Sequence, residues 1–428
     1  MESLYQVHLS SLILSISKII DFVDPHLKNH QLRVALIAKY IAEAYGLEKE
    51  YINQIVLAGC FHDIAIFSLK ERIQIIREEE FSDIHLHAKL GYNLLKDIPH
   101  FEKPALMIKY HHVFWEEHPF SKENEIPLGS YILHLADKIE IFLRQKKGDS
   151  IFWKDELIEF LKNLSGKVFM PDLVKAFQYV AQKTSFWLDM EYPNPEELVS
   201  FSLPHIILDL KALLKFSEVI RVIIDYRSRF TSIHSIGVAM LSRKLAELFH
   251  FGNLEKDLIT IAGYLHDIGK LAVPVEILEK HGPLTKTEWW LMQSHAYYSY
   301  RILEKIDIKH ISLWGALHHE KPNGKGYPFK LKDEDLSFGS KIVAVADIFT
   351  ALVEDRPYRK GLDAKTTKKI LKDLVLTNNI DSIVAEVVFK YFDEIYEYLK
   401  YIQAKEKEKY LEFEEKQIKK KKQVKKKL

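Results

Sequence analysis

One short motif occurs twice in this chain, and the repeat constrains the fold more than any other feature. The heptapeptide AGCFHDI at residues 58–64 returns as AGYLHDI at residues 262–268, which is 204 residues later. Further histidines and aspartates recur in the same order at offsets of 204 to 210 residues: His30 and His234, His87 and His295, His111-His112 and His318-His319, Asp137 and Asp347. An ordered series of this kind predicts two homologous domains.

Composition and proline positions indicate what these domains are. Gly and Pro are scarce, at 16 and 14 of 428 residues, and 47% of the chain is hydrophobic, which favours an all-α fold with a large core. Pro193, Pro195 and Pro204 interrupt the helical periodicity between the repeats. We therefore expect a first domain at residues 1–195, a second at 205–403 and a charged tail at 404–428.

Charge and cysteine content indicate the cellular compartment and the kinds of partner to expect. The single cysteine, Cys60, excludes an internal disulfide framework and fits the cytoplasm. No stretch reaches the roughly 18 apolar residues of a membrane-spanning helix, so we expect no transmembrane segment. Residues 404–428 hold eleven Lys and five Glu. This tail could contact anionic surfaces, although a solvated helix end is the simpler interpretation, and nothing else indicates a stable nucleic-acid partner.

Helical periodicity places polar residues of both repeats on apolar faces. Stripes with the spacing i, i+4, i+7, i+11 begin at His30 and His234, and their apolar members are Val34, Ile37 and Ile41, and Val238, Leu241 and Leu245. Asp347 has Val343 and Ala351 one turn to either side, so its carboxylate is also predicted to face inward. A buried carboxylate needs a cation or a strong set of donors.

The second domain combines seven residues that can bind metal. A lone histidine on an apolar face is more often a hydrogen-bonded core residue than a ligand, but five histidines and two aspartates together predict a metal centre. Imidazole and carboxylate without thiolate favour iron or manganese, with zinc, nickel and magnesium as alternatives. Seven ligands suit two divalent ions that share a carboxylate. The seven residues are His234, His266, Asp267, His295, His318, His319 and Asp347.

Three other features could contact a phosphate ester. Residues 322–328, PNGKGYP, hold two glycines and two prolines directly after two predicted ligands, so we expect them to wall a substrate pocket. Lys270 lies on nearly the same helical face as His266 and could bring a positive charge to a phosphate. Arg356 and Arg359 are spaced to clamp phosphate oxygens. The alternative for Lys270 is an ordinary surface lysine. The alternative for Arg356 and Arg359 is that they form ordinary surface ion pairs.

Residues 225–362 resemble the HD-GYP family of cyclic dinucleotide phosphodiesterases. The resemblance is carried by HDIGK at residues 266–270, His295, HHE at 318–320, GKGYP at 324–328, VAD at 345–347 and DRPYR at 355–359. It implies that the seven residues above are metal ligands and that Asp267 bridges two ions. It further implies that Asp267 and Lys270 are catalytic. The implied substrate contacts are Lys270, Gly326, Tyr327, Pro328, Arg356 and Arg359.

The function implied by this resemblance is hydrolysis of a cyclic dinucleotide, with cyclic di-GMP favoured, by a hydroxide that bridges the metals. Phe230 stands where members with a third metal carry glutamate, so we expect two ions and a linear dinucleotide product, with mononucleotides as the alternative. A weakly catalytic cyclic-dinucleotide receptor remains open, as does a hydrolase of 3′3′-cyclic GMP-AMP or of a dNTP. A homodimer is a further expectation.

The first domain resembles an HD domain that lacks the GYP loop. It retains the whole series of possible ligands, yet Ile66 replaces the lysine, and residues 113–119 replace the glutamate and the glycine-rich loop. Two interpretations stay open. One is a second metal site, and the other is a regulatory module whose inward polar residues only form hydrogen bonds. The residues concerned are His30, His62, Asp63, His87, His111, His112 and Asp137.

Overall fold

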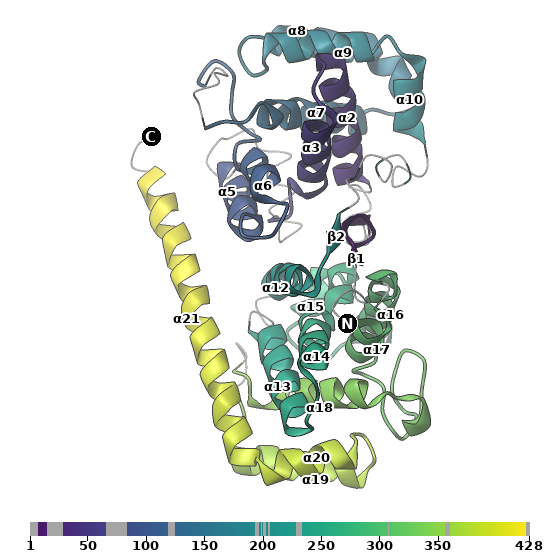
Figure 1. Ribbon diagram of the computed structural model, residues 1–428, viewed down its shortest axis with the longest axis vertical. Helices are drawn as coiled ribbons and strands as arrows, with labels where there is room; N and C mark the ends of the chain where they lie inside the picture. The colour runs from purple at the N-terminus through teal and green to yellow at the C-terminus, as the bar shows by residue number, and fades with distance from the viewer. Residues whose placement is uncertain are drawn as a thin grey trace. The chain divides into compact units, whose positions relative to one another are not determined.

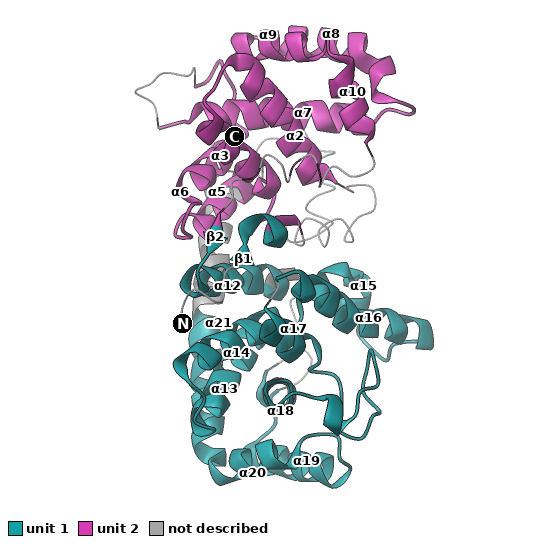
Figure 2. Ribbon diagram, turned by 45° about the vertical axis from the view of Figure 1, so that its right-hand side comes forward, with its two compact units in different colours: residues 1–12, 207–428 teal, residues 13–206 magenta. Residues whose placement is uncertain are grey.

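The computed structural model describes residues 7–14, 29–65, 84–118, 125–192, 197, 199, 203, 206–227, 233–306, 308–355 and 360–424. It divides into two compact units, one of residues 13–206 and the other of residues 1–12 with 207–428 (Figure 2). The described residues are almost entirely helical, which confirms the predicted all-α class.

The unit of residues 13–206 is a bundle of helices around the first copy of the repeat (Figure 1). Its described helices are α2 (His30–Tyr45), α3 (Lys49–Phe61), α5 (Ile84–Leu95), α6 (Glu102–Lys109), α7 (Leu128–Arg144), η3 (Ser150–Trp153), α8 (Lys154–Leu164), α9 (Pro171–Val180) and α10 (Thr184–Glu191). Gly46 takes a left-handed conformation with φ of 85° and ends α2, as a C-terminal cap requires.

The other unit repeats this helix order. Its helices are α12 (Leu210–Arg227), α13 (His234–Leu248), α14 (Asn253–Leu265), η4 (Ile268–Ala272), α15 (Val275–Leu278), α16 (Lys286–Leu303), η5 (Glu304–Ile306), α17 (Lys309–Ala316), η6 (Asp333–Asp335), α18 (Phe338–Val353), α19 (Ala364–Leu376), α20 (Ser382–Lys390) and α21 (Phe392–Val424). The pairs that pack in one unit, α2 with α3 and α7, match α13 with α14 and α18 in the other. The lysine-rich segment after residue 404 continues α21 as far as it is described.

The first residues of the chain belong to the unit of the second repeat. Val7–His8 (β1) pairs antiparallel with Ile207–Leu208 (β2), with Val7 opposite Leu208. Division of the sequence at prolines placed residues 1–12 in the first domain, because a two-residue pairing leaves no periodic pattern to read. The prolines at 193, 195 and 204 lie outside the described residues. In the described part of the chain, none of the helices has the length and apolar character that a membrane crossing needs.

A glycine of the repeated motif allows close packing at the same place in both units. A Cβ on Gly263 would lie 2.6 Å from the Ala239 Cα, and one on Gly59 would lie 2.7 Å from the Ala35 Cα. Such distances leave no room for a methyl group, so α14 and α3 press directly onto α13 and α2. This contact sets the distance between the histidine that begins one helix and the His-Asp pair that follows the other.

Both predicted apolar stripes lie in these contacts. Each of their members, His30 and His234 included, is at most 3% exposed. Asp347 on α18 is 8% exposed, so the expectation of an inward carboxylate is confirmed as well.

The substitution Gly263→Ala is expected to lower the free energy of unfolding by about 1–3 kcal/mol, the usual cost of overpacking. Helix propensity alone would favour alanine by about 1 kcal/mol, so the sign of the change separates packing from propensity. Gly252→Ala, at the start of the same helix, is the matched control, because its added Cβ makes only an ordinary contact with Glu255 at 3.5 Å. Urea unfolding measures both. A stabilised Gly263→Ala protein would contradict the packing argument.

Candidate metal centre

The seven predicted ligands of the second unit come from the ends and inner faces of five helices. His234 begins α13, His266 and Asp267 follow α14, His295 lies in α16, His318 and His319 follow α17, and Asp347 lies in α18. The structure brings six of them into two groups of three. In each group one ligand atom per residue lies within 4.8 Å of the others: His234, His266 and Asp267 in one, His295, His318 and His319 in the other.

Asp267 joins the two groups. Its Oδ2 lies 3.0 Å from His266 Nε2, while its Oδ1 lies 3.4 Å from His295 Nε2 and 3.7 Å from His318 Nε2. Asp347 spans them in a similar way, with Oδ1 3.0 Å from His234 Nε2 and Oδ2 4.0 Å from His319 Nδ1. Two carboxylates that each face both groups suit a pair of cations.

Backbone carbonyls fix the tautomer of three of the histidines. The Nδ1 atoms of His266 and His318 donate to the carbonyl oxygens of Gly263 and Gly315, each at 2.7 Å, and His295 donates to Met292. A neutral imidazole has only one N–H, so each Nε2 presents a bare lone pair. These Nε2 atoms and Asp267 Oδ1 are buried and lack hydrogen-bond partners among the described residues.

Lone pairs that face carboxylate oxygens repel them, and a cation between the two relieves this repulsion. Burial lowers the pKa of His295 to about 4 and that of His318 to about 3, so both imidazoles are neutral near pH 7. Burial alone would raise the pKa of Asp267, but neighbouring basic groups, Lys270 among them, outweigh it and hold the pKa well below its usual range. Neutral imidazoles with ionised carboxylates are the protonation states that metal binding needs.

His234 has a carboxylate behind it that sequence analysis missed. Its Nδ1 donates to Glu354 Oε2 at 3.1 Å, and Glu354 is almost fully buried. Burial would lower the pKa of His234, but Asp347 and Glu354 reverse the effect and raise it to about 10. Glu354 lies seven residues after Asp347 on one helical face, and that spacing was the available signal. A carboxylate on the far nitrogen orients a ligating histidine.

Lys270 lies at the site rather than on the surface. Its Nζ donates to Asp267 Oδ2, and its side chain is about one-fifth exposed. Contacts of Gly269 with α16 hold the backbone next to Lys270 in place. The Gly269 N–H donates to Ser299 Oγ at 3.0 Å, and a Cβ on Gly269 would come within 2.0 Å of the His295 carbonyl oxygen.

The glycine-rich loop folds back onto the two adjacent histidines. Tyr327 N–H donates to the His319 carbonyl at 3.2 Å, and the two rings lie 4.7 Å apart and tilted by 33°. A Cβ on Gly326 would meet Glu320 Cα at 2.4 Å, so only glycine allows this approach. Pro328 follows and is partly exposed. Arg356, Arg359 and Phe230 lie outside the described residues.

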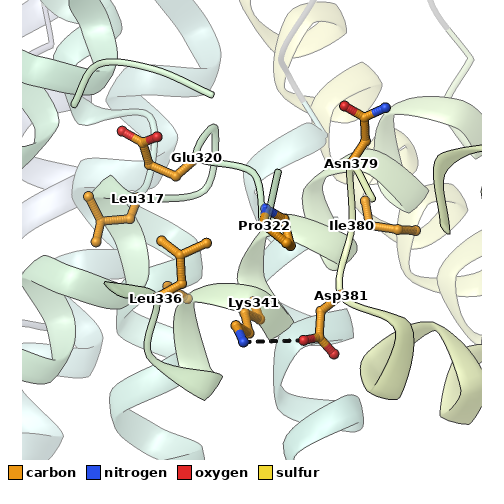
Figure 3. Close-up of a pocket in the computed structure, with 10 residues that line it drawn as sticks. Leu317, Glu320, Pro322, Leu336, Lys341, Asn379, Ile380 and Asp381 are labelled. Carbon is orange, nitrogen blue, oxygen red and sulfur yellow. Dashed lines mark ion pairs between the residues drawn. The ribbon is translucent and has the colours of Figure 1, made fainter. Parts of the chain in front are cut away.

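Glu320 holds the loop from inside. Its two carboxylate oxygens accept hydrogen bonds from Phe329 N–H at 2.7 Å and Leu331 N–H at 3.0 Å. The residue also borders a cavity of about 10 Å³, where an ion pair between Lys341 and Asp381 spans 3.4 Å (Figure 3). That volume holds about one water molecule and excludes a nucleotide.

The unit of residues 13–206 gathers its seven residues in a similar way. Two groups have ligand atoms within 4.8 Å of one another: His30, His62 and Asp137, and His87, His111 and His112. Asp63 Oδ2 lies 3.5 Å from His62 Nε2, and its Oδ1 lies 3.4 Å from His87 Nε2. Asp63 therefore faces both groups, as Asp267 does.

Comparison with known proteins identifies the family. Two models described as HD domains match residues 27–141 and 218–384. The chain is a protein of two HD domains. Each matched segment spans one complete set of the histidines and aspartates described above, so we call the two units the first and second HD domains.

Several characterised proteins resemble these HD domains. A "3'3'-cGAMP-specific phosphodiesterase 1" of Vibrio cholerae is 27% identical over 405 residues, which cover 92% of this chain and 94% of that protein. A "Cyclic di-GMP phosphodiesterase" of Thermotoga maritima is 36% identical over 34% of this chain and 41% of its own length. A crystal structure of a cyclic GMP-AMP-specific phosphodiesterase of V. cholerae has a TM-score of 0.62 at 23% identity and covers 93% of this chain and 98% of that one, which supports the fold.

The substitution Glu320→Ala is expected to speed amide hydrogen exchange in residues 326–331 by about tenfold or more, because it removes the acceptors of two backbone N–H groups. Exchange followed by mass spectrometry measures the loop directly. Glu334→Ala is the control, since Glu334 is an exposed acid close to the loop in sequence. Equal exchange in the two variants would show that Glu320 does not hold the loop.

Proposed function

We propose that the second HD domain is a metal-dependent phosphodiesterase that opens a 3′3′-linked cyclic dinucleotide. The observation that carries the proposal is the position of Asp267, whose two oxygens face two separate groups of buried histidines. Two-metal sites are used to hydrolyse phosphate esters. The named activities of the relatives from V. cholerae and T. maritima support this reaction class.

In this proposal each of the seven residues has a role in holding two divalent ions. The residues that would hold the ions are His234, His266, Asp267, His295, His318, His319 and Asp347. When bound, the ions act as Lewis acids on the phosphate and lower the pKa of a water molecule. The donor set fits them, because the bare Nε2 atoms and Asp267 Oδ1 have no other partner among the described residues. Imidazole and carboxylate ligands favour iron or manganese.

Other side chains of the site act on the substrate. Lys270 brings a positive charge next to Asp267, where it offsets negative charge on phosphate oxygens as the ester bond breaks. Gly326, Tyr327 and Pro328 border the bound substrate. Arg356 and Arg359, outside the described residues, remain predicted phosphate contacts, and Phe230 remains the reason to expect two ions and a linear product.

Two cyclic dinucleotides are candidate substrates. Cyclic di-GMP was favoured on family resemblance, whereas the relative that matches nearly the full chain is named for 3′3′-cyclic GMP-AMP. We propose that the site accepts at least one of the two. The cytoplasmic setting, a homodimer and contact of the tail with anionic surfaces remain predictions from the sequence.

The double substitution His266→Ala with Asp267→Ala is expected to lower turnover of cyclic di-GMP and 3′3′-cyclic GMP-AMP at least about a thousandfold, because it removes the bridging group and several kcal/mol of transition-state stabilisation. Protein purified without oxygen and loaded with iron or manganese is assayed by chromatography of the products. His310→Ala, an exposed histidine of α17, is the control. Unchanged turnover in the double variant would refute the proposed site. Tight binding without any product in the unaltered protein would favour a receptor.

We further infer that the first HD domain binds metal. His62 donates from Nδ1 to the carbonyl oxygen of Gly59, and its buried Nε2 has no hydrogen-bond partner among the described residues. His111 donates from Nδ1 to the carbonyl oxygen of Ile108, so its Nε2 is an acceptor. His87 Nε2 lies within hydrogen-bond distance of this atom, at 3.3 Å, and of His112 Nε2, at 3.1 Å. Burial lowers the pKa of His111 to about 3, so this imidazole is neutral near pH 7, the state in which a histidine binds a metal ion.

The charge around Asp63 supports the same inference. Asp63 and Asp137 form ion pairs only with histidines among the described residues, whereas Asp267 also has Lys270. Burial would lower the pKa of His30, but Glu140 and Asp63 raise it to about 10, so a protonated histidine balances part of this charge and a metal ion would take its place. Because the lysine and the GYP loop are absent, this centre is not assigned the hydrolysis of cyclic dinucleotides.

Metal analysis by mass spectrometry is expected to find about four ions per fully loaded chain, two for each group-bridging aspartate. His62→Ala with Asp63→Ala should lower the content by about two ions, as should His266→Ala with Asp267→Ala. Circular dichroism confirms that both variants remain helical. If the first variant retains the metal content of the unaltered chain, the first HD domain is a hydrogen-bonded module instead.

A further inference from the structure

An exposed tryptophan lies beside the loop that covers the metal ligands. Trp289 on α16 is 46% exposed, and its ring lies 6.3 Å from that of Tyr327 at an angle of 76°. Tyr327 in turn lies against His319. An indole at the surface is a large apolar group that gains free energy when a partner covers it.

The exposure of the ligands shows which side of the site is open. The side chains of His234, His266, His295 and His318 are at most 4% exposed, whereas that of His319 is 28% exposed. A molecule that reaches the ligands from solvent therefore arrives at His319. Tyr327 covers this residue, and Trp289 is the next ring outward from Tyr327.

The loop that presents Tyr327 is held at several points. Glu320 accepts two of its backbone N–H groups, and the Phe329 ring packs 5.1 Å from that of Tyr300 on α16. Because α16 also carries Trp289 and His295, the loop, the indole and a ligand share one framework. A surface held in this way loses little entropy when a ligand binds.

We propose that Trp289, together with Tyr327, forms a stacking surface for a purine base of the dinucleotide whose phosphodiester lies at His319. This rests on the proposed phosphodiesterase function. Stacking on an aromatic side chain contributes about 1–3 kcal/mol per base and tolerates any base, since each has a π face. The surface therefore holds the substrate by its bases without choosing guanine over adenine.

The next residue offers a matched comparison. Trp290 is 68% exposed on the same helix. Successive residues of a helix point about 100° apart, so Trp290 faces another direction, and no ring contact joins it to Tyr327 among the described residues. The Trp290→Ala substitution therefore measures how much affinity is lost when any exposed indole of this helix is removed. A general apolar docking face would involve both tryptophans.

The test measures binding and turnover separately in the full-length chain loaded with manganese. Calorimetry gives the affinity for cyclic di-GMP and for 3′3′-cyclic GMP-AMP of the unaltered protein and of Trp289→Ala, Trp289→Phe and Trp290→Ala. Calorimetry also gives the affinity of the same four proteins for inorganic phosphate, which has no aromatic ring, and chromatography of the products follows the turnover of both dinucleotides.

Trp289→Ala is expected to weaken binding of both dinucleotides by about tenfold or more, while Trp289→Phe retains most of the affinity and Trp290→Ala changes it by less than about twofold. The loss of affinity for the dinucleotides should exceed the loss of affinity for inorganic phosphate by about fivefold or more. Equal affinity in Trp289→Ala and the unaltered protein would overturn the inference, as would equal losses in Trp289→Ala and Trp290→Ala. Equal losses of affinity for the dinucleotides and for inorganic phosphate would do the same.

Failure of the proposed function has a different signature. If the unaltered protein binds dinucleotide through Trp289 but forms no product, the hydrolase assignment fails and the stacking surface stands. If normal hydrolysis accompanies unaltered affinity in Trp289→Ala, the stacking surface fails alone. If the unaltered protein binds neither dinucleotide, both are overturned.

Discussion

The structure depends on the donation of ring N–H groups to the carbonyl of the residue three positions earlier. His266, His295 and His318 in one domain, and His62 and His111 in the other, each donate from Nδ1 in this way. The bond leaves Nε2 as a lone pair aimed at the interior. Several such lone pairs next to ionised carboxylates are tolerated in a core only with positive charge between them.

The repeated helix frame explains why both domains share this arrangement. Gly59 and Gly263 let two helices touch, which sets the His-Asp pair against the histidine at the start of the neighbouring helix. The domains differ at the open side of the centre. In the part of the chain that the structure describes, the second has a lysine at the aspartate and the loop that brings Tyr327 over His319, and the first shows neither. The same frame therefore supports two centres with different access and charge.

The open side also connects metal chemistry with substrate recognition. His319 is the partly exposed histidine of the second centre, and aromatic rings extend from it to Trp289. Charged groups recognise phosphates, and aromatic surfaces recognise bases by stacking. The proposed metal pair and the proposed aromatic surface beside it therefore suit a compact, doubly charged dinucleotide. Glu320 supports this wall through hydrogen bonds to its backbone.

The sequence by itself determined the helical class, the duplication and the inward direction of His30, His234 and Asp347. Periodicity carries this information, because burial of a helix follows the spacing of its apolar residues. Tertiary packing decided how the histidines of each domain gather into two groups that both face one aspartate, Asp63 in the first domain and Asp267 in the second. Tertiary packing also decided the distances of 2.6 Å between His30 and Glu140 and of 3.1 Å between His234 and Glu354, although the spacing of Glu354 from Asp347 is a local signal that both face the same way. Contacts between residues far apart in the chain depend on how helices cross, and no local pattern specifies that distance.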